Sequence, residues 1–368
     1  MNLMKEISQK TLATYLDSRK WIKRYYPDFF PIKYSPFLTF ESLIGTGRVS
    51  SADIVSYNSS APQKTRRVIS RLKGDIPALR TQRSKSEVDL NTYNIIKSTA
   101  KTDAQMQALI DFVYDDVNFV VESIQSKLEY IALQALSQTA LSLNASNNGA
   151  GVITEKSISF GMAAANKEKE SAAGNYWTVG AKATNTPIDD IMAIMKEAKA
   201  AGVKLRYMVM NLSKYVEFRS SAQVLDFCYG ILISQAGITP NVSPTLATIN
   251  KVMKESGLCE IILIDTFIDL ENENHDITAV DPWENAAKSA KYVLFTPELP
   301  LGNMICGPIA AENINDPSIV QSKVGQILVQ SISSQDPISI KTVGLTNAFV
   351  DWSKIDQCWS LNTESTTW

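Results

Sequence analysis

Residues 103–144, DAQMQALIDFVYDDVNFVVESIQSKLEYIALQALSQTALSLN, decide what kind of fold this chain can form. Their apolar residues recur at alternating steps of three and four, which places them on one face of an α-helix. The stripe consists of Met106, Ile110, Val113, Val117, Val120, Ile124, Leu128, Ile131 and Ala135. No Pro or Gly interrupts the stretch, Thr102 or Asp103 can cap its start, and Asn144 followed by Gly149 marks its end. We therefore predict one helix about 60 Å long, more than the width of most single domains.

The single apolar stripe fits two packing arrangements, a coiled coil or a helix that lies on a β-sheet. Asp115, Asp116 and Asn118 crowd the middle of the helix, which is unfavourable for a coiled-coil seam. We interpret the adjacent acids Asp115 and Asp116 as solvated residues. The stripe itself is expected to lie in the chain's own core.

The segment before this helix is strongly basic and rich in Ser and Gln. Its basic residues, opposed only by Asp75, are Lys64, Arg66, Arg67, Arg71, Lys73, Arg80, Arg83 and Lys85. Strand-like patterns at 51–57 and 87–96 flank it, so we predict a long excursion of hairpin type, too polar to form a core. It can dock on the acidic surface of another copy, remain solvated, or contact nucleic-acid phosphate. Residues 59–85 contain no aromatic residue, which excludes base stacking.

The N-terminal residues 1–36 combine large aromatic side chains with prolines. A short helix is expected at 5–15, after which Pro27, Pro31 and Pro36 favour extended chain. Extended chain with large apolar rings must pack those rings on something, either the chain's own core or a neighbouring subunit. The candidates for contact with a neighbour are Trp21, Tyr25, Tyr26, Phe29 and Phe30.

Composition excludes several classes of protein. Hydrophobic residues make up 45% and charged residues 20% of the 368 residues, which is typical of a globular protein. A net charge of -2 is not that of a general nucleic-acid binder. Residues 1–10 lack the apolar core of a secretory signal, and no run of about 18 apolar residues predicts a membrane span. The widely spaced Cys228, Cys259, Cys306 and Cys358 indicate free thiols in a reducing cytosol.

The second half of the chain alternates between helical and strand patterns, which predicts a separate mixed α/β unit. Helices are expected at 186–202, 212–219 and 245–256, and strands of one sheet at 203–210, 258–265, 292–296 and 303–306. Strands at 338–347 and 357–361 are expected to close the fold by rejoining the first half.

Residues for chemistry are few. His275, the single histidine, stands in a polar turn, so Ser–His–Asp or Cys–His catalysis would depend on it alone. Gly45-Thr46-Gly47 begins like a dinucleotide-binding loop, but Ser50 replaces the last glycine and a strand pattern follows. We predict no catalytic residue, no cofactor, no metal site and no enzyme. Two alternatives stay open: a nucleic-acid-binding protein that uses residues 64–85, and an α/β enzyme with a site near His275.

Short motifs add a family resemblance. YPDFFP at 26–31, YVLFTPE at 292–298, PLG at 300–302 and the Gly-Pro pair at 307–308 resemble elements of tailed-phage major capsid proteins. The similarity is to the lambda-type branch, the major capsid protein E family. The order of the predicted elements resembles that of the family over nearly the whole chain. Residues 347–352 depart from the plainer Pro-rich entry expected before the last strand.

The resemblance implies an α+β fold of the Hong Kong 97 type. Its expected parts are an N-terminal arm at 1–47, an extended β-hairpin loop (E-loop) at 48–97, a peripheral domain at 98–185 with the spine helix 103–144, an α/β axial domain at 186–327, and a C-terminal return to the peripheral domain at 328–368. The basic residues and the N-terminal aromatic residues would then contact neighbouring subunits.

The resemblance also implies a function. The protein would be a structural major capsid protein that self-assembles into hexamers and pentamers, forming an icosahedral head shell around phage double-stranded DNA held without sequence specificity. Portal, scaffold and decoration proteins would be further partners, with no membrane involved. The location would be the virion, after assembly in the host cytoplasm.

Overall fold

The computed structural model describes residues 9–44, 70–99, 102–143, 147–148, 156–236, 243–271, 275–284, 292–314 and 316–366. The chain forms two compact units, each assembled from separate stretches. The first comprises Met1–Phe40, Lys73–Ile131 and Asn303–Asp351, and the second Glu41–Leu72, Ala132–Gly302 and Trp352–Trp368. The strand predicted at 51–57 and the Gly45–Ser50 loop lie outside the described residues.

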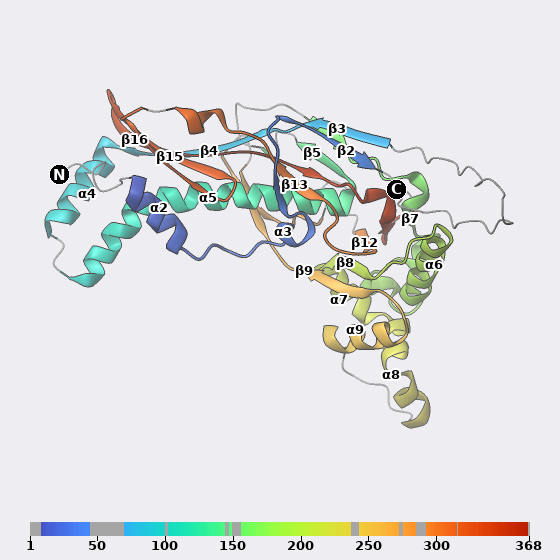
Figure 1. Cartoon of the computed structure of the whole chain (residues 1–368). Helices are drawn as coiled ribbons and strands as arrows, with labels where there is room; N and C mark the ends of the chain where they lie inside the picture. Colours follow the sequence, from blue (N-terminus) through green and yellow to red (C-terminus); the bar gives the residue numbers. More distant parts are fainter. Residues whose placement is uncertain are drawn as a thin grey trace, which may run out of the picture. The chain divides into compact units, whose positions relative to one another are not determined.

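The long helix is α5, Asp103–Gln138 (Figure 1). It ends six residues before the predicted end at 144 because Thr139 adopts a left-handed backbone with φ 54. Residues Ala140–Leu143 then form β5, which pairs antiparallel with β6, Lys156–Ser159. The helix was predicted to extend to 144 because the apolar residues of β5 directly follow it and continue its apolar pattern.

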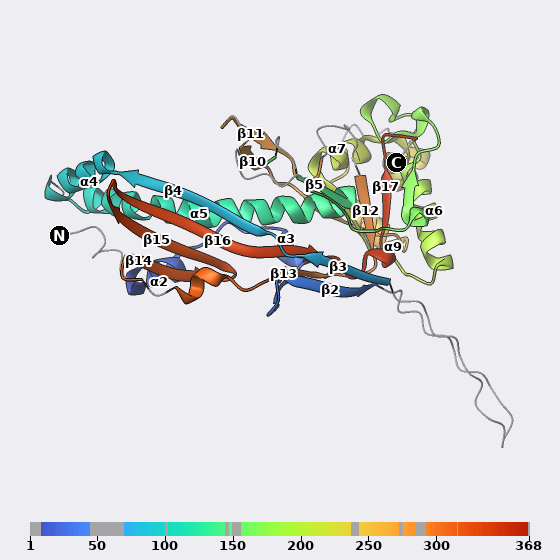
Figure 2. The ribbon, with the colours of Figure 1, turned by 90° about the horizontal axis from the view of Figure 1, so that it is seen from above.

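The sheet of the first unit is built around one long strand, β16, Ile338–Asp351. Its order is β1-β13-β16-β15-β14, with β4 also paired to β16. The other strands are β1 (Ile32–Tyr34), β4 (Ala78–Ser86), β13 (Asn303–Cys306), β14 (Ile319–Val324) and β15 (Ile327–Gln335). Figure 2 shows β4, β16 and β15 side by side, with α5 running along them.

The apolar stripe of α5 packs on this sheet, as predicted for the helix-on-sheet alternative. Val117, Val120 and Ile124 are buried. A Cβ atom added to Gly344 of β16 would lie 2.9 Å from Ile124 Cδ1 and 3.0 Å from Val120 Cβ, so only glycine allows this approach. At the start of the stripe, Ile110 is 40% exposed.

Between residues 9 and 30 the structure describes two helices. In α2, Gln9–Ser18, Leu12 and Leu16 are buried and Tyr15 stacks on Tyr114 of α5 at 4.0 Å. The short α3, Tyr26–Phe29, has Pro27 at its first turn, where a missing backbone N–H has no cost.

The region 70–99 corrects one sequence prediction. Strand β3, Ser70–Asp75, pairs with β2, Thr39–Ile44, and β4 follows. Residues 87–96, predicted as a strand, are part of helix α4, Glu87–Thr99. The cause is a local cap: the Ser86 N–H and Oγ both donate to Asp89 Oδ2 at 2.8 Å.

The second unit contains a five-stranded sheet of order β7-β17-β12-β8-β9. The strands are β7 (Lys167–Lys169), β8 (Tyr207–Asn211), β9 (Glu260–Ile264), β12 (Tyr292–Thr296) and β17 (Trp359–Asn362). The helices are α6 (Pro187–Ala200), α7 (Leu212–Ser220), α8 (Ala222–Ala236) and α9 (Leu246–Glu255). β10 (Ile268–Glu271) and β11 (Ile277–Val280) form a separate hairpin.

The sheet membership of two strands differs from the sequence prediction, wholly for β13 and partly for β17. β13 pairs with β16 in the first unit and not with the α/β sheet. β17 pairs with β7, which belongs to the first half of the chain, and also with β12 in the sheet of the second unit. The expected axial segment 186–327 therefore spans residues of both units. β14, β15 and α8 have no counterpart among the elements predicted from the sequence.

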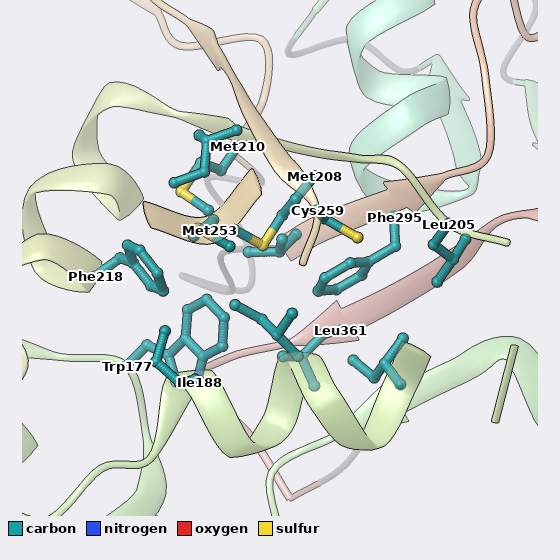
Figure 3. Close-up of a cluster of buried hydrophobic side chains, with 14 of the residues drawn as sticks. Trp177, Ile188, Leu205, Met208, Met210, Phe218, Met253, Cys259, Phe295 and Leu361 are labelled. Carbon is teal, nitrogen blue, oxygen red and sulfur yellow. The ribbon is translucent and has the colours of Figure 1, made fainter. Parts of the chain in front are cut away.

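The core of the second unit lies between the sheet and its helices. Figure 3 shows Trp177, Ile188, Met208, Phe218 and Leu361 converging there, and all five are buried. None of the described helices is long and apolar enough to cross a membrane.

Candidate assembly interface

The eight basic residues of the predicted interface fall into three groups. Lys64, Arg66 and Arg67 lie outside the described residues. Arg71 and Lys73 belong to β3. The last group, Arg80, Arg83 and Lys85, belongs to β4.

Lys85 forms a buried ion pair with Asp116 of α5. The two residues are 8% and 7% exposed, and the Lys85 ammonium also lies 5.2 Å from the ring centroid of Phe112. The interpretation of Asp116 as a solvated residue is therefore wrong, because strand β4 covers it. This contact places Lys85 in the core of its own subunit.

Arg83 lies two residues earlier and therefore on the same face of β4. Its Nη1 donates to Asp115 Oδ2 at 3.1 Å, and its guanidinium lies 3.6 Å from the centre of the Phe119 ring. Arg80 has the opposite parity along the strand and is exposed. The end of the basic segment is thus paired within the chain, whereas Arg80 faces solvent.

The N-terminal aromatic residues are fastened to α5 through Glu129. The backbone N–H groups of Tyr25 and Tyr26 donate to the two Glu129 carboxylate oxygens at 2.9 and 2.8 Å. Burial raises the pKa of Glu129, and these two hydrogen bonds oppose the rise. Gln326 Nε2 donates to Tyr26 Oη at 3.0 Å.

Three of the five aromatic candidates are consequently part of their own subunit's core. Tyr26, Phe29 and Phe30 are buried, whereas Trp21 and Tyr25 are half-buried. The first three have no surface left for a neighbour. Of the two packing sites left open by the sequence, the chain's own core accounts for these three rings.

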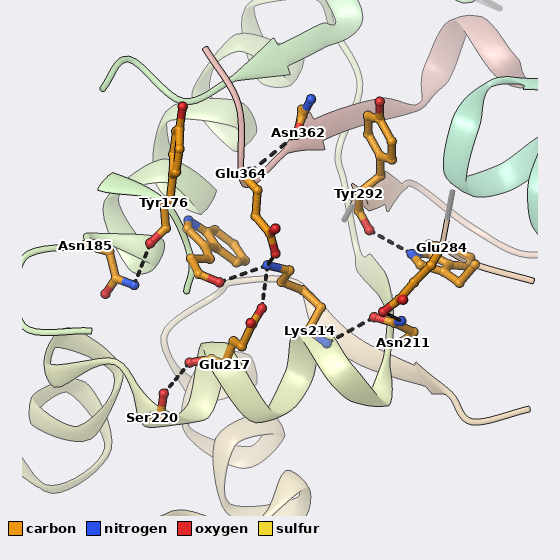
Figure 4. A network of polar contacts seen from close by, with 12 residues as sticks. Tyr176, Asn185, Asn211, Lys214, Glu217, Ser220, Glu284, Tyr292, Asn362 and Glu364 are labelled. Atoms are coloured by element: carbon orange, nitrogen blue, oxygen red, sulfur yellow. Dashed lines mark hydrogen bonds and ion pairs between the residues drawn. The ribbon is translucent and has the colours of Figure 1, made fainter. Parts of the chain in front are cut away.

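A buried lysine that the sequence analysis did not single out organises the second unit (Figure 4). Lys214 Nζ, with its side chain fully buried, donates to Trp177 O at 2.8 Å, Glu217 Oε2 at 2.7 Å and Glu364 Oε1 at 2.6 Å. All three ammonium protons therefore have acceptors. The Trp177 N–H also donates to Thr363 O at 3.0 Å, so the chain after β17 is held at two points.

Two carboxyl groups close to this lysine have raised pKa values. Burial, and then the charge of Asp190, raise the pKa of Glu170 to about 8. Burial also raises the pKa of Asp190, whose Oδ2 accepts a hydrogen bond from Trp177 Nε1 at 2.9 Å. The raised pKa values of these two acids result from their burial in the folded chain. No sequence pattern distinguishes them from the other acids.

His275 lies in an exposed turn of the β10–β11 hairpin. Its Nδ1 is 2.5 Å from Glu271 Oε1, and its backbone has φ 66. Within the described ranges, no group of three or more His, Cys, Asp or Glu side chains could hold a metal ion. Burial raises the pKa of Cys259 to about 12 and that of Cys306 to about 11, which disfavours reactive thiolates.

The fold defines the class of protein. A long helix on a β-sheet and a separate α/β unit form the Hong Kong 97-type fold, and the predicted fold class is confirmed. A prophage protein of E. coli CFT073, to which a capsid role is ascribed, is similar with a TM-score of 0.56 and 13% identity, covering 96% of this chain and 98% of its own. A phage-related protein of Bordetella bronchiseptica RB50 gives a TM-score of 0.53 and 10% identity, with 97% of each chain covered.

The sequence identifies the family within this class. The family model of phage major capsid protein E matches residues 8–239, and the chain belongs to this family. The predicted family is thereby confirmed, and it is a family of structural capsid proteins. No curated protein matches the chain in sequence.

Proposed function

We propose that many copies of this protein assemble into hexamers and pentamers that close into an icosahedral head shell around phage double-stranded DNA. The protein then acts as a structural subunit without a catalytic step, and it becomes part of the virion after assembly in the host cytoplasm. A portal, a scaffold and a decoration protein are partners of such a shell. Its strength comes from many modest contacts between copies.

Family membership over residues 8–239 is the observation that carries this proposal. A second observation supports the proposal: some basic residues of the segment are paired within the chain and others are exposed. Arg83 and Lys85 are paired with acids of the same chain, and Arg80 is exposed. We assign contact with a neighbouring copy to Lys64, Arg66, Arg67, Arg71, Lys73 and Arg80, and at the N-terminal arm to Trp21 and Tyr25.

The test is assembly of the purified protein. Concentrated subunits are expected to form shells, tubes or rings, visible in negative-stain images and in sedimentation. A strictly monomeric species at high concentration, in both low and high salt, would contradict the proposal. Nuclease-protected DNA in particles from infected or expressing cells tests the enclosure of the genome.

A charge-reversal variant tests the role of the basic segment. Replacing Arg66, Arg67, Arg71 and Arg80 with Glu is expected to block assembly and leave the subunit folded. The matched control replaces four exposed lysines of the second unit, Lys199, Lys204, Lys251 and Lys254, with Glu. Full shells from the first variant would contradict docking, and normal shells without DNA would instead assign the segment to phosphate contacts.

A further inference from the structure

The hairpin of β10 and β11, whose strands lie side by side in Figure 2, has one face on which every side chain is exposed. Cross-strand pairing puts Asp269 opposite Ala279 and Glu271 opposite Ile277, so these four side chains share one face. All four are exposed, and Ile277 is 70% exposed. On the other face Ile268 is buried.

This exposed face has the properties of an unfilled contact surface. The two strands pair with no further strand among the described residues, and a lone two-stranded hairpin has little stability of its own. Phe267, at the entry to β10, is 67% exposed. Large apolar side chains grouped with polar neighbours on an exposed surface are typical of a protein interaction site.

The charge around the hairpin identifies the chemistry of its partner. Residues 260–284 contain eight Asp or Glu and no Lys or Arg. A nucleic-acid backbone would be repelled by this surface, whereas a basic polypeptide would be attracted. The partner must also supply apolar side chains to cover Phe267 and Ile277.

The basic segment of this chain has both properties. Residues 66–73, RRVISRLK, interleave four basic residues with Val68, Ile69 and Leu72. The only acid between residues 64 and 85 is Asp75, so the segment carries a large excess of positive charge. In-chain pairing is seen at Arg83 and Lys85, at the far end of the segment from Arg66.

We propose that the hairpin face formed by Phe267, Asp269, Glu271, Ile277 and Ala279 is the surface on which the basic segment of a neighbouring copy docks. The inference rests on the proposed assembly and names the acidic partner surface within it. Carboxylates pair with the arginines, and Ile277 and Phe267 pack against the interleaved apolar residues. The occupant is a second copy of this chain.

A charge-swap experiment tests the assignment. Asp269→Lys with Glu271→Lys should leave the subunit folded and, because the weak pair recurs at every subunit contact, reduce the yield of shells by roughly tenfold or more. Adding Arg66→Glu, Arg67→Glu and Arg71→Glu to the same chain should restore assembly. The control Asp226→Lys with Glu255→Lys makes the same charge change at exposed sites on α8 and α9 and should assemble normally.

A cross-linking experiment gives a second readout that does not depend on the reversed charges. Subunits carrying Asp269→Cys are mixed with subunits carrying Arg67→Cys, assembled and oxidised. Both chains also carry Cys228→Ser, because Cys228 is half-buried. A disulfide-linked dimer is then expected only in the mixture, because native Cys259, Cys306 and Cys358 are buried.

The outcomes separate this inference from the proposed function. Shells from unsubstituted protein together with normal shells from the Asp269→Lys, Glu271→Lys variant, or with no rescue by the swap, would overturn the hairpin assignment alone. A disulfide formed within single chains carrying both cysteines, and never between chains, would also overturn it. Absence of shells from the unsubstituted protein would instead count against the proposed function.

Discussion

Replacing Gly344 with Ala tests how closely α5 lies on the sheet of the first unit. The added Cβ would be 2.9 Å from Ile124 Cδ1, 3.0 Å from Val120 Cβ and 3.1 Å from Val120 O. Two of these atoms belong to the helix backbone or are attached directly to it, so rotation of a side chain cannot relieve the clash. Overpacking of this kind costs about 1–3 kcal/mol. The smaller conformational entropy of the unfolded chain with Ala returns about 0.4–1 kcal/mol, which leaves a net loss of about 0–2.6 kcal/mol, with a midpoint of about 1.3 kcal/mol.

The assay is chemical and thermal unfolding of the purified subunit, where each kcal/mol shifts Tm by about 2–4 °C in a unit of this size. Gly174→Ala is the matched control, because a Cβ there meets nothing within 4 Å and should leave stability equal or slightly higher. Ile124→Val removes the atom at 2.9 Å and should therefore cost less in the Gly344→Ala background than alone. A neutral Gly344→Ala with strictly additive effects would refute this packing.

Two further predictions concern buried charges. Asp116→Asn leaves Lys85 charged and buried and should lower the free energy of unfolding by about 3–5 kcal/mol. Asp115→Asn removes a mostly exposed partner of Arg83 and should cost about 0–1 kcal/mol. Equal losses for the two variants in denaturant titrations would contradict the difference in burial. Because the folded pKa of Glu170 is raised to about 8 from 4.5, the folded state binds this proton more tightly than the unfolded state does. Stability should therefore fall as pH rises from 5 to 8, by up to about 1.4 kcal/mol per unit from this group, and Glu170→Gln should flatten that part of the profile; an unchanged slope in the variant would assign the pH dependence to other groups.

The features that the sequence predicted well depend on local periodicity. The stripe from Val117 to Ile131 repeats with the period of a helix, and its burial follows from that repeat whatever it packs against. The end of the helix was misplaced because the left-handed turn at Thr139 has no glycine to announce it. Residues 87–96 were misread because the cap between Ser86 and Asp89 outweighs their strand-like spacing.

The features that the sequence did not predict depend on partners distant along the chain. The lengths of β13 and β17 were predicted closely, but the choice of sheet is made by pairing with β16 and with β12, which no local pattern encodes. Lys85 and Asp116 were both singled out, yet their pairing requires β4 to lie on α5. The role of Lys214 likewise depends on Glu364, far along the chain.

The central place of β16 has a consequence for how the chain is made. During synthesis α5 is complete once Gln138 has been added, but the strand that covers Val120 and Ile124 begins only at Ile338. At about 5–20 residues per second, the apolar face of the helix waits on the order of ten seconds or more for its partner. Contacts this distant in sequence also make folding slow, so the apolar face of α5 is exposed to aggregation in the newly made chain. A chain released before Ile338 lacks β16 and therefore cannot form the sheet of the first unit.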